Sequence, residues 1–90
     1  ADIAFLGCNA VSPSGNVMVG NTPETGIKHK IMDISDEIYL LADSSKFGSY
    51  SLISYASVND FHGVITDRYL PQNIQKEIQD LGGKFIFSDN

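Results

Sequence analysis

The chain has 90 residues, of which 42% are apolar and 10% aromatic, and it carries a net charge of -5. This composition indicates one globular domain and excludes a disordered or fibrous chain. The balance of 11 acidic against 6 basic residues lacks the positive surface of a nucleic-acid-binding segment. A domain of this size buries only about 60 to 65% of its unfolded surface, so we expect it to form a homo-oligomer or to pack against further chain.

The first predicted strand begins almost at the first residue. An apolar run from Ile3 to Leu6 predicts a buried strand, and the absence of an initiator Met before it suggests a fragment of a larger protein. The segment from Cys8 to Gly20 has no clear period, and we expect a loop with a short extended piece at Val17 to Val19. Its glycines lack the lysine and hydroxyl of a P-loop.

A helix is predicted after this loop. Ile27, Ile31 and Ile34 recur at steps of four and three, so they share one helical face. The sequence Thr22-Pro23-Glu24 predicts its start, with Thr22 as the N-cap and Pro23 at the first helical position.

The second half of the chain repeats the alternation of strand and helix. A second helix from about Pro71 to Leu81 is expected to bury Ile74, Ile78 and Leu81 and to end at Gly82 and Gly83. Tyr50 to Val58 alternates weakly, which favours extended structure. The other predicted strands are Ile38 to Ala42, Gly63 to Thr66 and Lys84 to Phe87.

This order predicts an α/β fold: an open, mainly parallel, Rossmann-like sheet with flanking helices and right-handed crossovers. The loops after the first three strands then lie at one edge of the sheet, where open α/β folds bind ligands. That edge collects Gly7, Cys8, Asn9, Asp43, Ser44, Lys46 and Asp67.

Each polar residue at this edge has a structural and a functional interpretation. Lys46 suits a phosphate or carboxylate, but Asp43 can instead accept backbone N–H bonds in a turn beside a solvated Lys46. Glu24 suits a helix N-terminus, and Asn9 suits either a left-handed turn or a sugar hydroxyl. Asp67 is expected to form a turn.

The remaining titratable side chains give no metal or redox signal. Cys8, the single cysteine, is interpreted as a small buried side chain, and His29 and His62 as surface or loop residues. No apolar run approaches the roughly 20 residues of a membrane span, so we expect a cytoplasmic location, no membrane partner, no metal and no cofactor.

Several blocks of sequence, taken in order, resemble the effector-sensing domain of DeoR-family transcriptional repressors. The most specific is Asp43-Ser44-Ser45-Lys46-Phe47-Gly48, followed by Ile65-Thr66-Asp67. The earlier blocks are the run from Ala1 to Ser12 and Thr22-Pro23-Glu24 with Lys28, Lys30 and Met32. The resemblance covers nearly the whole chain.

The resemblance implies a function. Residues 1–90 would be a single domain, the later part of a sensor that binds a phosphorylated sugar through Gly7, Asn9, Glu24, Asp43 and Lys46. A missing N-terminal winged helix-turn-helix would bind operator DNA, and a missing upstream loop would cradle the phosphate. Tetramers are what the family suggests.

The family's fold is similar to that of ribose-5-phosphate isomerases, sugar-phosphate deaminases and coenzyme A transferases. The isomerases place an acidic block after the equivalent strand, where this chain has Leu6-Gly7-Cys8-Asn9-Ala10. Glu24 takes the place of their base and Lys46 that of a substrate-contacting lysine. Since proton transfer needs both a base and a group that stabilises the developing charge, we expect binding without turnover. The alternative is a fragment of a sugar-phosphate isomerase or deaminase.

Overall fold

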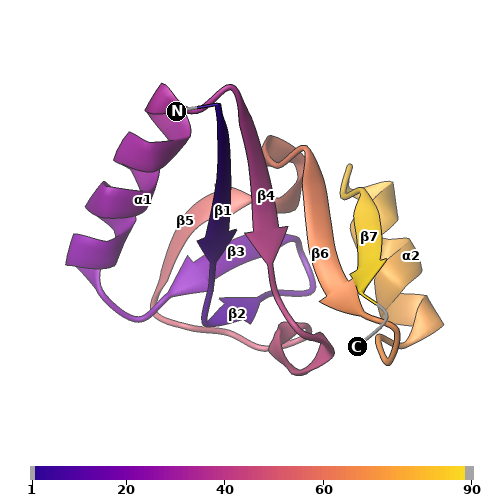
Figure 1. Cartoon of the computed structure of the whole chain (residues 1–90). Helices are drawn as coiled ribbons and strands as arrows, with labels where there is room; N and C mark the ends of the chain where they lie inside the picture. The colour runs from indigo at the N-terminus through magenta and orange to yellow at the C-terminus, as the bar shows by residue number, and fades with distance from the viewer. Residues whose placement is uncertain (1, 89–90) are drawn as a thin grey trace.

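The fold contains two sheets packed face to face, with a helix at each side (Figure 1). The structure is a computed structural model, and it describes residues 2–88. The larger sheet is parallel, with strand order β1-β4-β6-β7. Its strands are β1 (Ile3–Gly7), β4 (Glu37–Leu41), β6 (Gly63–Asp67) and β7 (Phe85–Ser88). All four predicted strands, and the parallel arrangement, are confirmed.

The smaller sheet is antiparallel, and the sequence predicted it only in part. Its strands, in order, are β2 (Ala10–Val11), β3 (Asn16–Val19) and β5 (Ile53–Ser57). The extended structure expected within Tyr50 to Val58 and at Val17 to Val19 is confirmed. The loop expected from Cys8 to Gly20 is wrong in detail, because β2 and β3 form a hairpin there. A two-residue strand is too short to show the alternation that identifies strands in a sequence.

The hydrophobic core lies between the two sheets. Leu6, Leu40 and Val64 point from adjacent parallel strands towards Val17 and Val19 of the small sheet, and all are buried. We call this side of the parallel sheet the inner face and the opposite side the outer face. In Figure 1 the small sheet and α2 lie behind the parallel sheet, and no described element lies in front of it.

The first helix, α1 (Thr22–Ile34), lies beside β1, and its start differs from the prediction. Asn21 is the N-cap, because its side-chain oxygen accepts the Glu24 backbone N–H at 3.0 Å. Thr22 is therefore the first helical residue. The shared isoleucine face is only partly used: Ile31 packs against the core, whereas Ile27 is 63% exposed.

The second helix, α2 (Gln72–Asp80), follows β6 and leads to β7. Ile78 is fully buried and Ile74 packs against the core, as predicted, but Leu81 is 42% exposed and lies beyond the last helical turn. Gly82 ends the helix with φ of 100°, a left-handed conformation that glycine adopts without strain. Two short 3₁₀ turns, η1 (Ser44–Lys46) and η2 (Val58–Asp60), complete the fold. Neither α1 nor α2 is long and apolar enough to span a membrane.

Candidate functional site

The candidate site lies where the parallel strands end. The register pairs Gly7 with Leu41 and Leu41 with Ile65, so the loops after β1, β4 and β6 emerge side by side. Figure 1 shows the N-terminus of α1 and the turn η1 at this same edge, at the bottom of the view. The topology therefore gathers the segments that carry Gly7, Asn9, Asp43 and Lys46, as the sequence predicted.

The loop after β4 is a tightly hydrogen-bonded turn. Asp43 Oδ1 accepts the Ser45 backbone N–H at 2.9 Å and is also bonded to the Ser45 hydroxyl. Asp67 Oδ2 accepts the Ser44 backbone N–H at 3.0 Å and thereby ties this turn to the end of β6. At its far end, buried Phe47 anchors the chain to the core. The turn-forming interpretation of Asp43 and Asp67 is thus confirmed, and Lys46 is held half-buried on a fixed scaffold.

The same hydrogen bonds act on the titration of Asp67. The Ser44 N–H, and then the Tyr69 N–H at 2.9 Å, hold the pKa of this carboxyl below its usual value. Asp67 is therefore ionised at neutral pH, and both of its oxygens are engaged in the turn.

Cys8 follows β1, and its half-buried thiol has a shifted pKa. Burial raises the pKa of its thiol to about 11, although the positive charges of Lys46 and Lys28 act to lower it. The thiol is therefore protonated at neutral pH and is not an activated nucleophile, which agrees with the sequence interpretation. The carboxylate of Asp43 acts in the opposite direction to the two lysines and contributes to the raised pKa of the thiol.

Tyr55 connects this end of β1 to α1. Its buried side chain crosses from β5, and its hydroxyl donates to the Gly7 carbonyl oxygen at 2.9 Å. Burial, with smaller effects of Cys8 and Glu24, raises the pKa of this hydroxyl, which stays a donor. Lys28 Nζ lies 5.4 Å from the centre of the Tyr55 ring, within range of a cation–π interaction.

The N-terminus of α1 brings Glu24 to the site edge. Asn21 Nδ2 donates to Glu24 Oε2 at 3.2 Å, so the N-cap also orients this carboxylate. The preceding Gly20 lies beside the loops of the site: a Cβ built on it would be 3.8 Å from Asn9 Nδ2 and 3.9 Å from Ser51 Oγ. The helix-terminus interpretation of Glu24 is confirmed.

Asn9 is extended. Within residues 2–88, positive φ occurs only at glycines, so the left-handed alternative for Asn9 is wrong. Its backbone N–H donates to the Met18 carbonyl oxygen at 2.9 Å, and its side chain is exposed. The amide group is therefore directed to solvent at the end of β1, beside the start of α1.

Sequence reasoning missed the residues that support this edge. Tyr55 and Lys28 come from segments that only the tertiary structure brings near the end of β1, and Ser51 is brought near Gly20. Asn21 had a readable signal, because Asn is among the best N-cap residues and stands directly before Thr-Pro-Glu.

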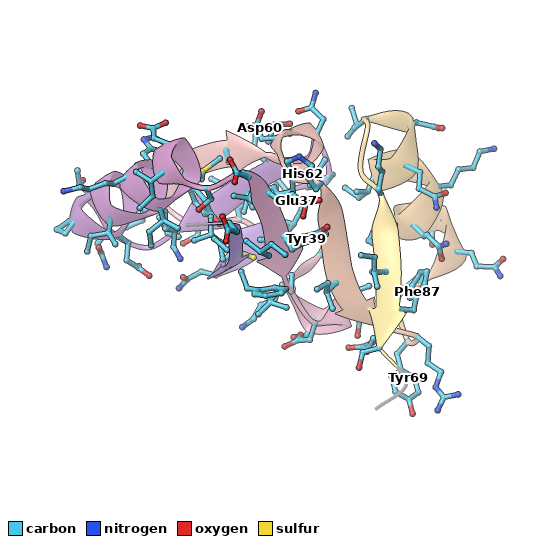
Figure 2. All side chains as sticks on the ribbon, turned by 45° about the horizontal axis from the view of Figure 1, so that its top comes forward. Glu37, Tyr39, Asp60, His62, Tyr69 and Phe87 are labelled. Atoms are coloured by element: carbon cyan, nitrogen blue, oxygen red, sulfur yellow. The ribbon has the colours of Figure 1, made fainter. Side chains whose placement is uncertain are left out.

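The histidines take no part in the edge. His29 Nε2 lies 2.6 Å from the Tyr55 carbonyl oxygen, so this nitrogen carries the proton. His62 precedes β6 and lies near Glu37 and Tyr39 at the opposite end of the sheet (Figure 2), where its Nδ1 accepts the Ile38 N–H at 3.1 Å. Among residues 2–88 no group of three His, Cys, Asp or Glu side chains is placed to hold a metal ion.

The fold is an α/β domain with polar side chains at the carboxyl edge of its parallel sheet. Residues 1–68 match the family model described as the DeoR C-terminal sensor domain. The chain belongs to this family.

Curated relatives agree with this assignment. The L-fucose operon activator of Haemophilus influenzae is 36% identical over 75 residues, which are 83% of this chain and 30% of that protein. The transcriptional regulator GlpR of Haloferax volcanii is 31% identical over 81 residues, 90% of this chain and 32% of that protein. The repressor GlcR of Bacillus subtilis is 32% identical over 82 residues, 91% of this chain and 31% of that protein. The chain thus spans about a third of the length of these relatives.

Proposed function

We propose that this chain is the later part of the effector-sensing domain of a transcriptional regulator of sugar metabolism, and that a phosphorylated sugar binds at the carboxyl edge of its parallel sheet. The observation that carries the proposal is the placement of polar side chains where the parallel strands end. Lys46 lies on the turn η1 after β4, and the exposed Asn9 follows β1. Lys28 lies over the ring of Tyr55, whose hydroxyl donates to Gly7 at the end of β1. The ammonium groups suit a phosphate, and the neighbouring amide and carboxylate groups suit hydroxyls.

Each of the proposed ligand-binding residues would make a different contact with the sugar phosphate. Lys46, fixed by η1, donates to the anionic group, while Glu24, oriented by Asn21, accepts from sugar hydroxyls. Asn9 both donates and accepts. Asp43 has one carboxylate oxygen engaged in its turn and contributes its other oxygen. A Cβ at Gly7 would meet nothing within 4 Å, so the ligand can approach the backbone there.

The edge supports binding without turnover. The residues that follow Leu6 are Gly7, Cys8, Asn9 and Ala10, none of which is a carboxylate, and the Cys8 thiol is protonated at neutral pH. Moving a proton between sugar carbons requires a base and a group that stabilises the developing charge. Glu24 could supply the base. An enzyme would still need a group from another part of the protein to stabilise the developing charge.

Ligand binding would change the affinity for operator DNA through the rest of the polypeptide. The net charge of -5 gives this segment no nucleic-acid footprint, so DNA contacts are assigned to a separate N-terminal domain. An effector alters operator affinity only if it binds two arrangements of the assembly, here a cytoplasmic homo-oligomer, with different affinity. Related regulators include an activator and repressors, so the direction of regulation belongs to each protein.

The test uses the complete regulator with a panel of sugar phosphates and the matching unphosphorylated sugars, read by thermal shift and by operator release. We expect a response to at least one phosphorylated sugar and a weaker response to its unphosphorylated form. Equal responses to both, or none to any, would contradict the proposal, and measurable isomerase or deaminase turnover would support the alternative.

Substitution of one lysine tests the assignment of the edge. Lys46→Ala removes a charged donor whose hydrogen bond contributes about 1.5–3 kcal/mol, so ligand affinity should fall roughly ten- to hundredfold. Lys76→Ala is the matched control, because Lys76 is exposed on α2, away from the edge. Equal effects of the two substitutions would remove Lys46 from the site.

A further inference from the structure

The sequence block Ile65-Thr66-Asp67 has no part in the proposed ligand contacts, yet it ends beside the turn η1. Pairing of β4 with β6 extends to the Ala42 backbone N–H, which donates to the Ile65 carbonyl oxygen at 3.0 Å. The same register places Asp67 next to Asp43, the residue that precedes η1. Two carboxylates from different strands thus lie at the start of one turn.

Each of these carboxylates accepts one of the first N–H groups of η1. Such groups have no partner within the helical turn itself. Asp43 Oδ1 accepts the Ser45 N–H at 2.9 Å, a bond between residues two positions apart, which fixes the local shape of the turn. Asp67 Oδ2 accepts the Ser44 N–H at 3.0 Å from 23 positions away. Only the Asp67 bond therefore fixes the turn relative to the next strand of the sheet.

The carboxylate of Asp67 is itself held in place. Its Oδ1 accepts the Tyr69 N–H at 2.9 Å, so each oxygen already has a backbone donor. The Ser44 and Tyr69 N–H groups keep the pKa of this carboxyl below its usual value, and the acceptor is charged at neutral pH. Hydrogen bonds to a charged acceptor are the stronger ones. These bonds assign Asp67 to the support of the turn.

The other end of η1 has a second anchor. Phe47 follows Lys46 directly, and its buried side chain packs in the core. Lys46 therefore lies between two fixed points, the bond from Ser44 to Asp67 before it and the ring of Phe47 after it. A donor that is held in place before binding loses less freedom when the ligand arrives, so affinity is higher.

We propose that Asp67 is a positioning residue of the ligand site, because its carboxylate holds η1 where Lys46 meets the anionic group of the ligand. Asp67 acts through Lys46 and makes no ligand contact of its own. This role rests on the proposed function, since it requires Lys46 to bind an anion.

The test measures ligand affinity of the complete regulator by titration calorimetry. The probe is the sugar phosphate that binds the wild-type protein most tightly in the panel described above, and inorganic phosphate is the second probe. Asp67→Asn turns an amide group towards one of the two N–H donors, so affinity for both probes should fall roughly tenfold. Asp80→Asn is the matched control, because Asp80 is exposed at the end of α2, and it should leave both affinities unchanged.

The same substitution in a Lys46→Ala background separates positioning from general support of the fold. If Asp67 acts through Lys46, Asp67→Asn should then change affinity by less than about twofold. If Asp67→Asn does not fold, Ser44→Pro replaces it with the same expectations. Proline removes the donated N–H and suits the first position of a helical turn, and Asp43 before it is extended with ψ of 166°.

Two results would overturn the positioning role alone. One is unchanged affinity of Asp67→Asn when Lys46→Ala binds more weakly than the wild-type protein. The other is an equal loss in the two backgrounds, which would mean that Asp67 supports the fold in general. Unchanged affinity of Lys46→Ala would instead remove Lys46 from the site, and the proposed ligand contacts would fail together with the role of Asp67.

Discussion

The two helices share a sequence pattern but differ in what they bury. In α2 the apolar residues face the core, with Ile78 1% exposed, and no side chain caps the N-terminus. In α1 no residue is fully buried, yet the N-terminus is closed by the reciprocal bonds between Asn21 and Glu24. Thus α2 buries one side chain completely, whereas α1 packs through the partly buried Ile31 and Met32 and has a capped first turn.

Matched isoleucine substitutions test this division most strongly. Ile78→Ala should lower the free energy of unfolding by about 2–5 kcal/mol, because it leaves a cavity in the core. Ile27→Ala should change the same free energy by less than about 0.5 kcal/mol, because Ile27 is mostly exposed. Urea denaturation of the 90-residue chain measures both. A large cost at Ile27 would show that another surface covers it.

Matched glycine substitutions should act in opposite directions. Gly82→Ala should destabilise the chain by at least about 1–2 kcal/mol, because Gly82 is left-handed. The added Cβ would also lie 2.7 Å from the Asn59 Cβ. Gly26→Ala, inside α1, should stabilise the chain by about 0.5–1 kcal/mol, since its Cβ would meet nothing within 4 Å. Thermal unfolding of both variants provides the comparison. If Gly26→Ala is destabilising, the backbone at Gly26 does not have the regular helical conformation that favours alanine.

The N-cap provides the next contrast. Asn21→Ala removes the side-chain bond to the Glu24 N–H and should cost about 1 kcal/mol of stability. Asn73→Ala serves as control, because Asn73 is exposed in the first turn of α2, and alanine is the better helix former. Chemical denaturation should therefore show a loss only for Asn21→Ala. Equal effects would mean that the cap contributes little to α1.

The smallest expected effect is the change that a lysine substitution makes in the pKa of the Cys8 thiol. A pKa of about 11, against an ordinary 9.0, makes labelling of the folded chain at pH 8 roughly a hundredfold slower than labelling of a free thiol. The protonated thiol contributes to the free energy of unfolding below its ordinary pKa. This contribution is lost as the pH rises from about 9 through 11. Lys28→Gln on α1 should raise the pKa further, whereas Lys76→Gln on α2 should leave it unchanged. The pH dependence of the alkylation rate distinguishes the two variants.

Most of the parallel sheet was predictable from the sequence, because its strands are short apolar runs with clear boundaries. The convergence of the loops at the carboxyl edge followed from the parallel order, and Asp43, Asp67 and Cys8 behave as their residue types and positions suggested. The small sheet was harder to predict. Its two-residue strand β2 carries no periodicity of its own and is defined by pairing with β3.

The site was predictable as a place but not as a set of contacts. The positions of Gly7, Asn9, Glu24, Asp43 and Lys46 at one edge follow from strand ends and a helix start, which are local features. The support from Tyr55 does not, because its hydroxyl reaches Gly7 across 48 positions of sequence. Ligand contacts for these five residues stay a prediction.

By itself, the sequence determined the alternating strands and helices, the family and the polar edge, because these depend on local periodicity, boundaries and motifs. Only the tertiary structure decided which apolar faces are covered. The same apolar spacing of four and then three residues occurs in both helices. Ile74 and Ile78 of α2 pack in the core, whereas in α1 only Ile31 packs against it, and Ile27 and Ile34 are exposed. The physical reason is that periodicity places residues on one face of a helix, whereas burial depends on what the rest of the chain places against that face.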